Sequence, residues 1–184
     1  MATGGATSRA NKAPGWTRYM WEGAAALLAL PFIAMRFTAE VNWSAFDFIV
    51  MGALLAAACG TVEFAARRGG SAAYKLAVIS AVAGGFLIIW VNLAVGHEHG
   101  PYHLLLYAAL LVGIVGSAIA RFGSKGMAVA MLATAAALVV ALRLAMLNDA
   151  DPEGSNLLVT SVASAAIASP FLMAAWLFRR AART

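Results

Sequence analysis

The chain has 184 residues, of which 62% are hydrophobic and only 11% are charged, and its mean hydropathy is +0.82. A soluble domain carries roughly a quarter charged residues because its surface faces water, so this composition excludes an ordinary soluble protein. The net charge of +5 is divided among short clusters between apolar runs. This distribution excludes the continuous basic stripe of a nucleic-acid-binding protein. The single cysteine, Cys59, excludes an internal disulfide and a CxxC redox or zinc motif.

The chain order is a polar tail followed by six apolar runs. Residues 1–18 are rich in Gly, Ala, Thr and Ser and are expected to form a disordered cytoplasmic tail. Each apolar run is close to the ~20 residues that a helix needs to cross a bilayer. The runs cover about 20–37, 46–65, 75–95, 102–120, 127–147 and 157–178. The sequence therefore predicts an all-α transmembrane helical bundle of about six spans, built as three hairpins in a single domain, 19–184.

The basic residues predict the orientation of this bundle. Eleven of the 13 Lys and Arg residues fall before the first run, between alternate runs or after the last run. These eleven are Arg9, Lys12, Arg18, Arg67, Arg68, Lys75, Arg121, Lys125, Arg179, Arg180 and Arg183. Short loops rich in Lys and Arg stay in the cytoplasm. We therefore expect both termini on the cytoplasmic side, with Arg36 and Arg143 near the outer face.

The three histidines lie within seven residues, in the predicted outer loop between the third and fourth runs. Neutral imidazole and carboxylate groups are ligands for zinc, copper and nickel. His97, Glu98, His99 and His103 are therefore a candidate metal site, although their spacing matches no defined metal motif. The alternative interpretation is a set of solvated loop histidines, in which case no cofactor is expected.

Several polar residues within or beside the apolar runs are candidates for structural contacts. Glu63 precedes Arg67 by four residues, the favourable order for an ion pair on a helix. Arg36 and Arg143 are expected to reach the headgroups or to pair with Glu40, Asp47 or Asp149 across the outer loops. Asn92 is expected to form a hydrogen bond between helices.

Two stretches of the sequence carry a resemblance. They are Arg36-Phe37-Thr38-Ala39-Glu40-Val41-Asn42-Trp43 and Trp90-Val91-Asn92-Leu93-Ala94-Val95-Gly96. With these stretches the chain resembles, over about residues 20–130, an uncharacterised family of small bacterial polytopic inner-membrane proteins with RFT-x-E-VNW and W-VN-x-AVG motifs. The resemblance implies a multi-pass protein of the bacterial inner membrane but no known activity. In that family the loop after the second motif is acidic and rich in Asn and Pro, whereas this chain has histidines there.

The resemblance directs attention to the residues at the outer ends of the runs. They form a candidate outer polar patch of Arg36, Glu40, Asn42, Asp47, Asn92 and Arg143. A carrier would need polar groups along a path toward the middle of the bilayer. The central sequence offers mostly Ala, Leu, Val, Gly and Ser.

No nucleophile with a matching base is visible among the runs, so no catalytic residue is predicted and an enzyme is not expected. The leading hypothesis is a small carrier or an accessory subunit of a membrane complex, with the lipid bilayer and a homo-oligomer or larger complex as partners. The alternatives are a metal-binding membrane protein that uses the histidine loop and, third, an enzyme acting on lipid or quinone.

Overall fold

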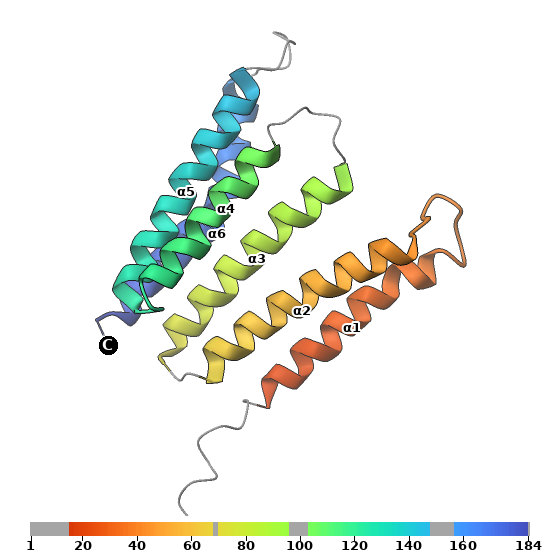
Figure 1. Cartoon of the computed structure of the whole chain (residues 1–184), viewed down its shortest axis with the longest axis horizontal. Coiled ribbons are helices and arrows are strands. Elements are labelled where there is room, and N and C mark those ends of the chain that lie inside the picture. Colours follow the sequence, from red (N-terminus) through yellow and green to blue (C-terminus); the bar gives the residue numbers. More distant parts are fainter. Residues whose placement is uncertain (1–14, 68–69, 96–102, 148–156, 184) are drawn as a thin grey trace, which may run out of the picture. The chain divides into compact units, whose positions relative to one another are not determined.

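The computed structural model describes residues 15–67, 70–95, 103–147 and 157–183, and within these ranges the chain forms six α-helices and no strand (Figure 1). The helices are α1 (Trp16–Ala34), α2 (Ala45–Arg67), α3 (Ala72–Val95), α4 (His103–Ile119), α5 (Ser124–Leu147) and α6 (Leu157–Ala181). Each predicted apolar run is helical. The all-α class is therefore confirmed.

The first helix differs from its predicted bounds at both ends. α1 begins at Trp16, so the last residues of the predicted tail are helical, while residues 1–14 lie outside the described ranges. This first turn is supported by Arg18, whose Nε donates a 2.7 Å hydrogen bond to Glu22 one turn later. At its other end α1 stops at Ala34 rather than near residue 37, because the next amides bond in tight turns, such as Phe37 N–H to the Ala34 carbonyl.

Four of the helices are long and apolar enough to cross a membrane: Ala45–Arg67, Ala72–Ala94, Ser124–Ala145 and Ser161–Ala181. α4 is apolar but has 17 residues, and α1 carries Arg18 and Glu22 in its first two turns. The four long helices are what a membrane protein requires. The count of six spans stays a prediction.

Contacts group the chain into two compact units. Unit 1, Met1–Gly69, contains α1 and α2, and unit 2, Gly70–Thr184, contains α3 to α6. The single domain expected over 19–184 stays a prediction.

Within unit 2, α6 packs against both α3 and α5, and α4 packs against α5 (Figure 1). The predicted hairpin of α5 and α6 is therefore close-packed. The predicted hairpin of α3 and α4 is loose, because each of these helices makes most of its contacts with a helix from the last hairpin. The centre of the unit is filled by Leu138, Thr134 and Phe178, the largest fully buried side chains of the described residues.

The close approach of α3 to α6 depends on a glycine opposite a proline. A Cβ atom at Gly84 would lie 2.8 Å from Cβ of Pro170, so only glycine allows this distance. Pro170 lies inside α6 and cannot donate a hydrogen bond to the Ala166 carbonyl. The Ser169 hydroxyl donates to that carbonyl instead, at 2.9 Å, and Ser80 of α3 donates to the Pro170 carbonyl at 2.8 Å.

Glycines also bring α4 close to α5. A Cβ at Gly113 would lie 2.6 Å from Oγ1 of Thr134, and a Cβ at Gly116 would lie 2.9 Å from Cβ of Ala130. Small residues at such positions let helix backbones approach closely in lipid. Unit 2 is therefore held at two helix crossings by residues with little or no side chain.

The turn between α4 and α5 has a left-handed backbone. Arg121 and Phe122 have φ values of 49° and 61°, where glycine is the usual residue. The amide of Phe122 donates to the Ser117 carbonyl at 3.2 Å and the amide of Arg121 donates to the Ala118 carbonyl at 2.9 Å. These bonds satisfy carbonyl groups at the end of α4. The chain therefore passes from α4 to α5 through a tight turn.

Candidate functional site

The unit 1 members of the predicted outer polar patch do not pair with one another. Asp47 accepts hydrogen bonds from the backbone amide and the hydroxyl of Ser44, both at 2.7 Å, and Ser44 Oγ accepts the Asp47 amide at 3.3 Å. This reciprocal arrangement caps the first turn of α2. Glu40 and Asn42 are exposed, and the Glu40 amide donates to Thr38 Oγ1 at 3.1 Å. Asp47 is therefore a structural residue of its own helix.

Arg36 contacts aromatic rings instead of carboxylates. Its guanidinium lies 5.7 Å from the centre of the Phe32 ring. The Phe32 ring packs edge-on against the Phe48 ring, with 6.4 Å between the ring centres. The Trp43 ring also packs edge-on against Phe48, with 5.3 Å between the ring centres. Within the described residues, ion pairs join only Arg18 to Glu22 and Arg67 to Glu63, so the predicted pairing of Arg36 with Glu40 or Asp47 is wrong.

The physical reason for this correction is that Asp47 is held by the α2 cap, while Phe32 lies one helical turn before Arg36 and offers its ring. Attraction between a guanidinium and an aromatic face suits the boundary between membrane and water, where the ring contacts apolar groups and the charge contacts water. The spacing Phe32-x-x-x-Arg36 was the available signal for this contact.

The unit 2 members of the patch also have local partners. The Asn92 amide donates to the Ile88 carbonyl of its own helix at 2.7 Å, so the predicted bond from Asn92 to another helix is wrong. A carbonyl one turn earlier is always within reach of an amide side chain, whereas a partner on a neighbouring helix depends on packing. Arg143 of α5 donates to the Ser161 hydroxyl of α6 at 3.1 Å and so links these two helices. Asp149, its other expected partner, lies outside the described residues.

A patch that joins both sets of residues would require both units, and it stays a prediction. The same holds for the metal site. His97, Glu98 and His99 lie outside the described residues, and His103 is the first residue of α4. In the part of the chain that is described, no three His, Cys, Asp or Glu side chains come together as metal ligands would.

The clearest polar cluster in the described residues is at the other end of unit 1. Arg67 Nε donates to Oε1 of Glu63 at 3.0 Å, which confirms the predicted ion pair. The indole of Trp21 donates to the second carboxylate oxygen at 2.7 Å and so connects α1 to α2. The spacing of Glu63 and Arg67 predicts their pair, whereas the partner from α1 depends on how the two helices align.

Cys59 lies one turn from Glu63 on the same helix. Its thiol is buried, and the Sγ atom is 4.0 Å from the Met20 carbonyl of α1. This buried position is that of a packing residue. The interface of unit 1 thus has a carboxylate and a thiol on α2 that both face α1.

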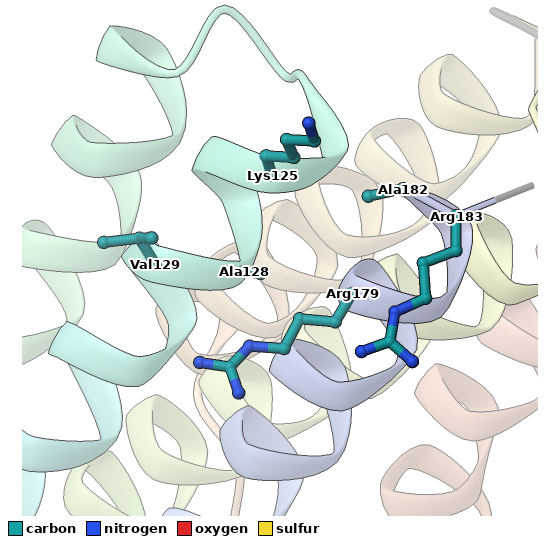
Figure 2. Close-up of a pocket in the computed structure, with 6 residues that line it drawn as sticks. All are labelled: Lys125, Ala128, Val129, Arg179, Ala182 and Arg183. Carbon is teal, nitrogen blue, oxygen red and sulfur yellow. The ribbon is translucent and has the colours of Figure 1, made fainter.

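A second group of charges surrounds a hollow in unit 2, at the end where α5 begins and α6 finishes. This hollow of about 280 Å³ is lined by Lys125, Ala128, Val129, Arg179, Ala182 and Arg183 (Figure 2). Arg179 lies in the last turn of α6, Arg183 lies just beyond the end of that helix, and Lys125 stands on the first turn of α5. We call this hollow the basic pocket. The basic clusters were predicted as orientation signals, and the sequence does not show that two of them meet.

A neighbouring hollow of about 370 Å³ lies at the same end of unit 2 and is lined by Gly70, Ser71, Tyr74, Ser124 and Ala181. The Tyr74 hydroxyl donates to the Phe122 carbonyl in the α4–α5 turn at 3.0 Å, and its ring packs edge-on against Phe178 at 5.2 Å. One tyrosine therefore connects the start of α3 with that turn and with the end of α6.

The four long apolar helices are those of a helical membrane protein. Comparison of the chain with protein-family models, with curated proteins and with solved structures finds no match.

Proposed function

We propose that this chain is a non-enzymatic, multi-pass protein of the bacterial inner membrane that acts as an accessory or structural subunit of a larger membrane complex. In this proposal all six helices cross the bilayer, and both termini are cytoplasmic. The basic clusters on one side support the orientation, and the resemblance carried by the RFT-x-E-VNW stretch supports the bacterial inner membrane. The small-carrier hypothesis is the competing one.

The observation that carries the proposal is the interior of unit 2. Its buried polar side chains among the described residues are Ser117, Thr134 and Ser164, and none of them is charged. Ser117 donates to the Gly113 carbonyl at 2.7 Å and Thr134 to the Ala130 carbonyl at 2.8 Å, each within its own helix. A carrier needs polar groups that face a water-filled path in the middle of the bilayer. Hydroxyl groups that bond their own backbone beside tightly packed glycines support a closed bundle instead.

Cysteine accessibility tests this proposal against the carrier hypothesis. In a Cys59→Ala background, single cysteines are placed at two fully buried positions, Thr134→Cys and Ala174→Cys, and at the exposed turn residue, Arg121→Cys. Native membranes are then treated with a membrane-impermeant maleimide from each side. We expect Arg121→Cys to react from the cytoplasmic side only and the two buried positions to react from neither side.

Reaction at position 134 or 174 would contradict the closed bundle and favour a carrier. Reaction of Arg121→Cys from the outer side would contradict the orientation. Both outcomes are readable in the same membranes, because the exposed cysteine is the positive control for the reagent.

The existence of a partner needs a separate measurement. A photo-crosslinking residue at Ile49, whose side chain is 68% exposed on α2, is expected to capture a second membrane protein in intact cells. The same residue at Ala77, which is fully buried on α3, is the matched control and should capture none. If Ile49 crosslinks only to lipid, the accessory-subunit proposal fails.

A further inference from the structure

The basic pocket lies where two apolar helices leave the membrane. The candidate spans Ser124–Ala145 and Ser161–Ala181 begin and end, respectively, at this pocket. When α5 and α6 cross a bilayer, their ends lie at the level of the lipid headgroups. Trp176, one turn before the end cluster of α6, is 48% exposed and has the position of an interfacial aromatic residue.

The pocket concentrates positive charge without neutralising it. The pocket is lined by Lys125, Arg179 and Arg183. Among the described residues, the carboxylates that form ion pairs are Glu22 and Glu63, and both belong to unit 1. Arg179 lies in the last turn of α6 and Arg183 lies two residues beyond its end, so two like charges that repel each other are at the same end of this helix. The start of α5 adds the partial positive charge of a helix N-terminus. An anion in the pocket would relieve this repulsion.

The chemistry of the lining favours a phosphate attached to a lipid. Arginine presents a planar fork of N–H donors that matches two phosphate oxygens, and two arginines line this pocket (Figure 2). The rest of the lining is apolar: Ala128, Val129 and Ala182. Val129 is 65% exposed and continues along the apolar surface of the α5 span, so an acyl chain would have an apolar surface beside the phosphate.

Arg180 provides a contrast within the same turn of α6. Its guanidinium lies 4.0 Å from the centre of the Trp176 ring, so its charge is engaged by an aromatic face outside the pocket. Charge alone does not distinguish Arg180 from its neighbours. Its placement does.

We infer that the basic pocket binds the phosphate group of an anionic phospholipid through Arg179, Arg183 and Lys125. Basic pockets between membrane helices are suited to such headgroups. The ligand is held by charge and by the arginine forks, with its acyl chains along α5 and α6.

Native mass spectrometry of the full chain in detergent micelles tests this inference. Wild-type protein is mixed with equal amounts of phosphatidylglycerol and phosphatidylcholine, and the two lipid-bound populations are compared. We expect a preference of about tenfold for phosphatidylglycerol, because each Lys or Arg near an anionic lipid contributes several-fold to affinity. The double variant Arg179→Gln/Arg183→Gln should lose most of this preference.

The matched control is Arg180→Gln/Lys75→Gln, which removes the same net charge from the same unit outside the pocket. It should keep the preference. Arg179→Lys/Arg183→Lys keeps the charge and removes the forks, and we expect an intermediate preference. Thermal unfolding of each variant shows whether it is folded, and the lysine variant keeps the test valid if the glutamine variant is not.

Three results would overturn the inference: no lipid preference in the wild type, an equal loss in the control pair, or full displacement of phosphatidylglycerol by inorganic phosphate at matched concentration. The last result would assign the pocket to free phosphate. A preference that depends on Arg179 and Arg183 and survives inorganic phosphate supports the lipid.

Discussion

Different kinds of contact hold the helices together inside each of the two units. In unit 2, α5 is the most buried of the candidate spans, and α4 approaches it across Gly113 and Gly116. In unit 1, the α2 span is less buried, and none of the described glycines of this unit has a close neighbour. The nearest contact is Leu28 at 3.6 Å from a Cβ at Gly52. The helices of unit 1 are connected by an indole–carboxylate bond and by a ring cluster near their ends.

The difference shows two ways in which helices can associate in lipid, where the hydrophobic effect does not bring them together. Lipid is as apolar as a leucine side chain, so helices associate through close packing or through polar bonds. Unit 2 combines close packing at its glycines with polar bonds such as that from Ser80 to the Pro170 carbonyl, whereas unit 1 has a polar bond without close glycine packing. Polar contacts near the helix ends leave the flanks of α1 and α2 apolar and open, as a surface for lipid or a partner requires.

Replacement of Gly84 by valine should produce the largest effect on this comparison. The new side chain would meet Pro170, so we expect a loss of about 2–3 kcal/mol in the free energy of unfolding, as for overpacked cores. Gly85→Val is the matched control, because a Cβ at Gly85 has nothing within 4 Å. Denaturation in mixed micelles measures both. Equal losses for the two variants would show that the α3–α6 crossing does not depend on close packing.

Metal binding by the histidine loop would add a third kind of contact. The loop connects α3 to α4, which share few contacts, so a metal held by His97, His99 and His103 should stabilise unit 2. At about a hundred times the dissociation constant, the gain would be about 2.7 kcal/mol. If the loop binds metal, the purified, untagged protein should contain zinc, copper or nickel, and the triple alanine variant should contain none. No metal in either sample would leave these histidines as solvated loop residues.

Removal of the Trp21–Glu63 bond should loosen unit 1 and leave unit 2 unchanged. Cys59 is buried beside this bond and is the only thiol in the chain, so its rate of alkylation reports the opening of α1 from α2. We expect Trp21→Phe to raise this rate by about threefold to tenfold, because a lost partner leaves the carboxylate incompletely bonded. Glu22→Gln, which breaks an exposed ion pair in the same helix, is the control and should not change it. An unchanged rate in Trp21→Phe would show that the bond does not hold α1 against α2.

The smallest expected effect is a gain. Arg121→Gly places glycine at a φ of 49°, where arginine is strained, and should raise the free energy of unfolding by about 0.5–1 kcal/mol. Gly123→Ala, in the same turn, serves as the comparison, because Gly123 does not have a left-handed φ and a Cβ there would lie 3.3 Å from the Ala120 carbonyl oxygen. Thermal unfolding measures both. A loss in Arg121→Gly would mean that the arginine side chain contributes more than its backbone strain costs.

The sequence predicts the helices well, because an apolar run bounded by charges or by Gly and Ser has one favourable structure in lipid. It also predicts the Glu63–Arg67 pair, since both residues lie on one helix at a fixed spacing. The wrong predictions involve contacts across helices or loops. Asn92 bonds its own backbone, and Arg36 lies over a ring instead of a carboxylate.

The basic pocket was missed for the same reason. Lys125 and Arg179 belong to two clusters 54 residues apart in the sequence, and each cluster alone explains only orientation. Their meeting depends on the packing of α5 against α6. Charge counts carry no information on that register.

The bond from Ser80 to the Pro170 carbonyl joins residues that are separated by 90 positions. Ribosomes add about 5–20 residues per second, so α3 waits roughly 5–20 s for the helix that covers its glycine face. During that interval α3 has been synthesised, but α6, which packs against it, has not. The assembly of unit 2 is therefore completed only when its last helix has been made. A chain that stops before α6 would contain an α3 without its packing partner.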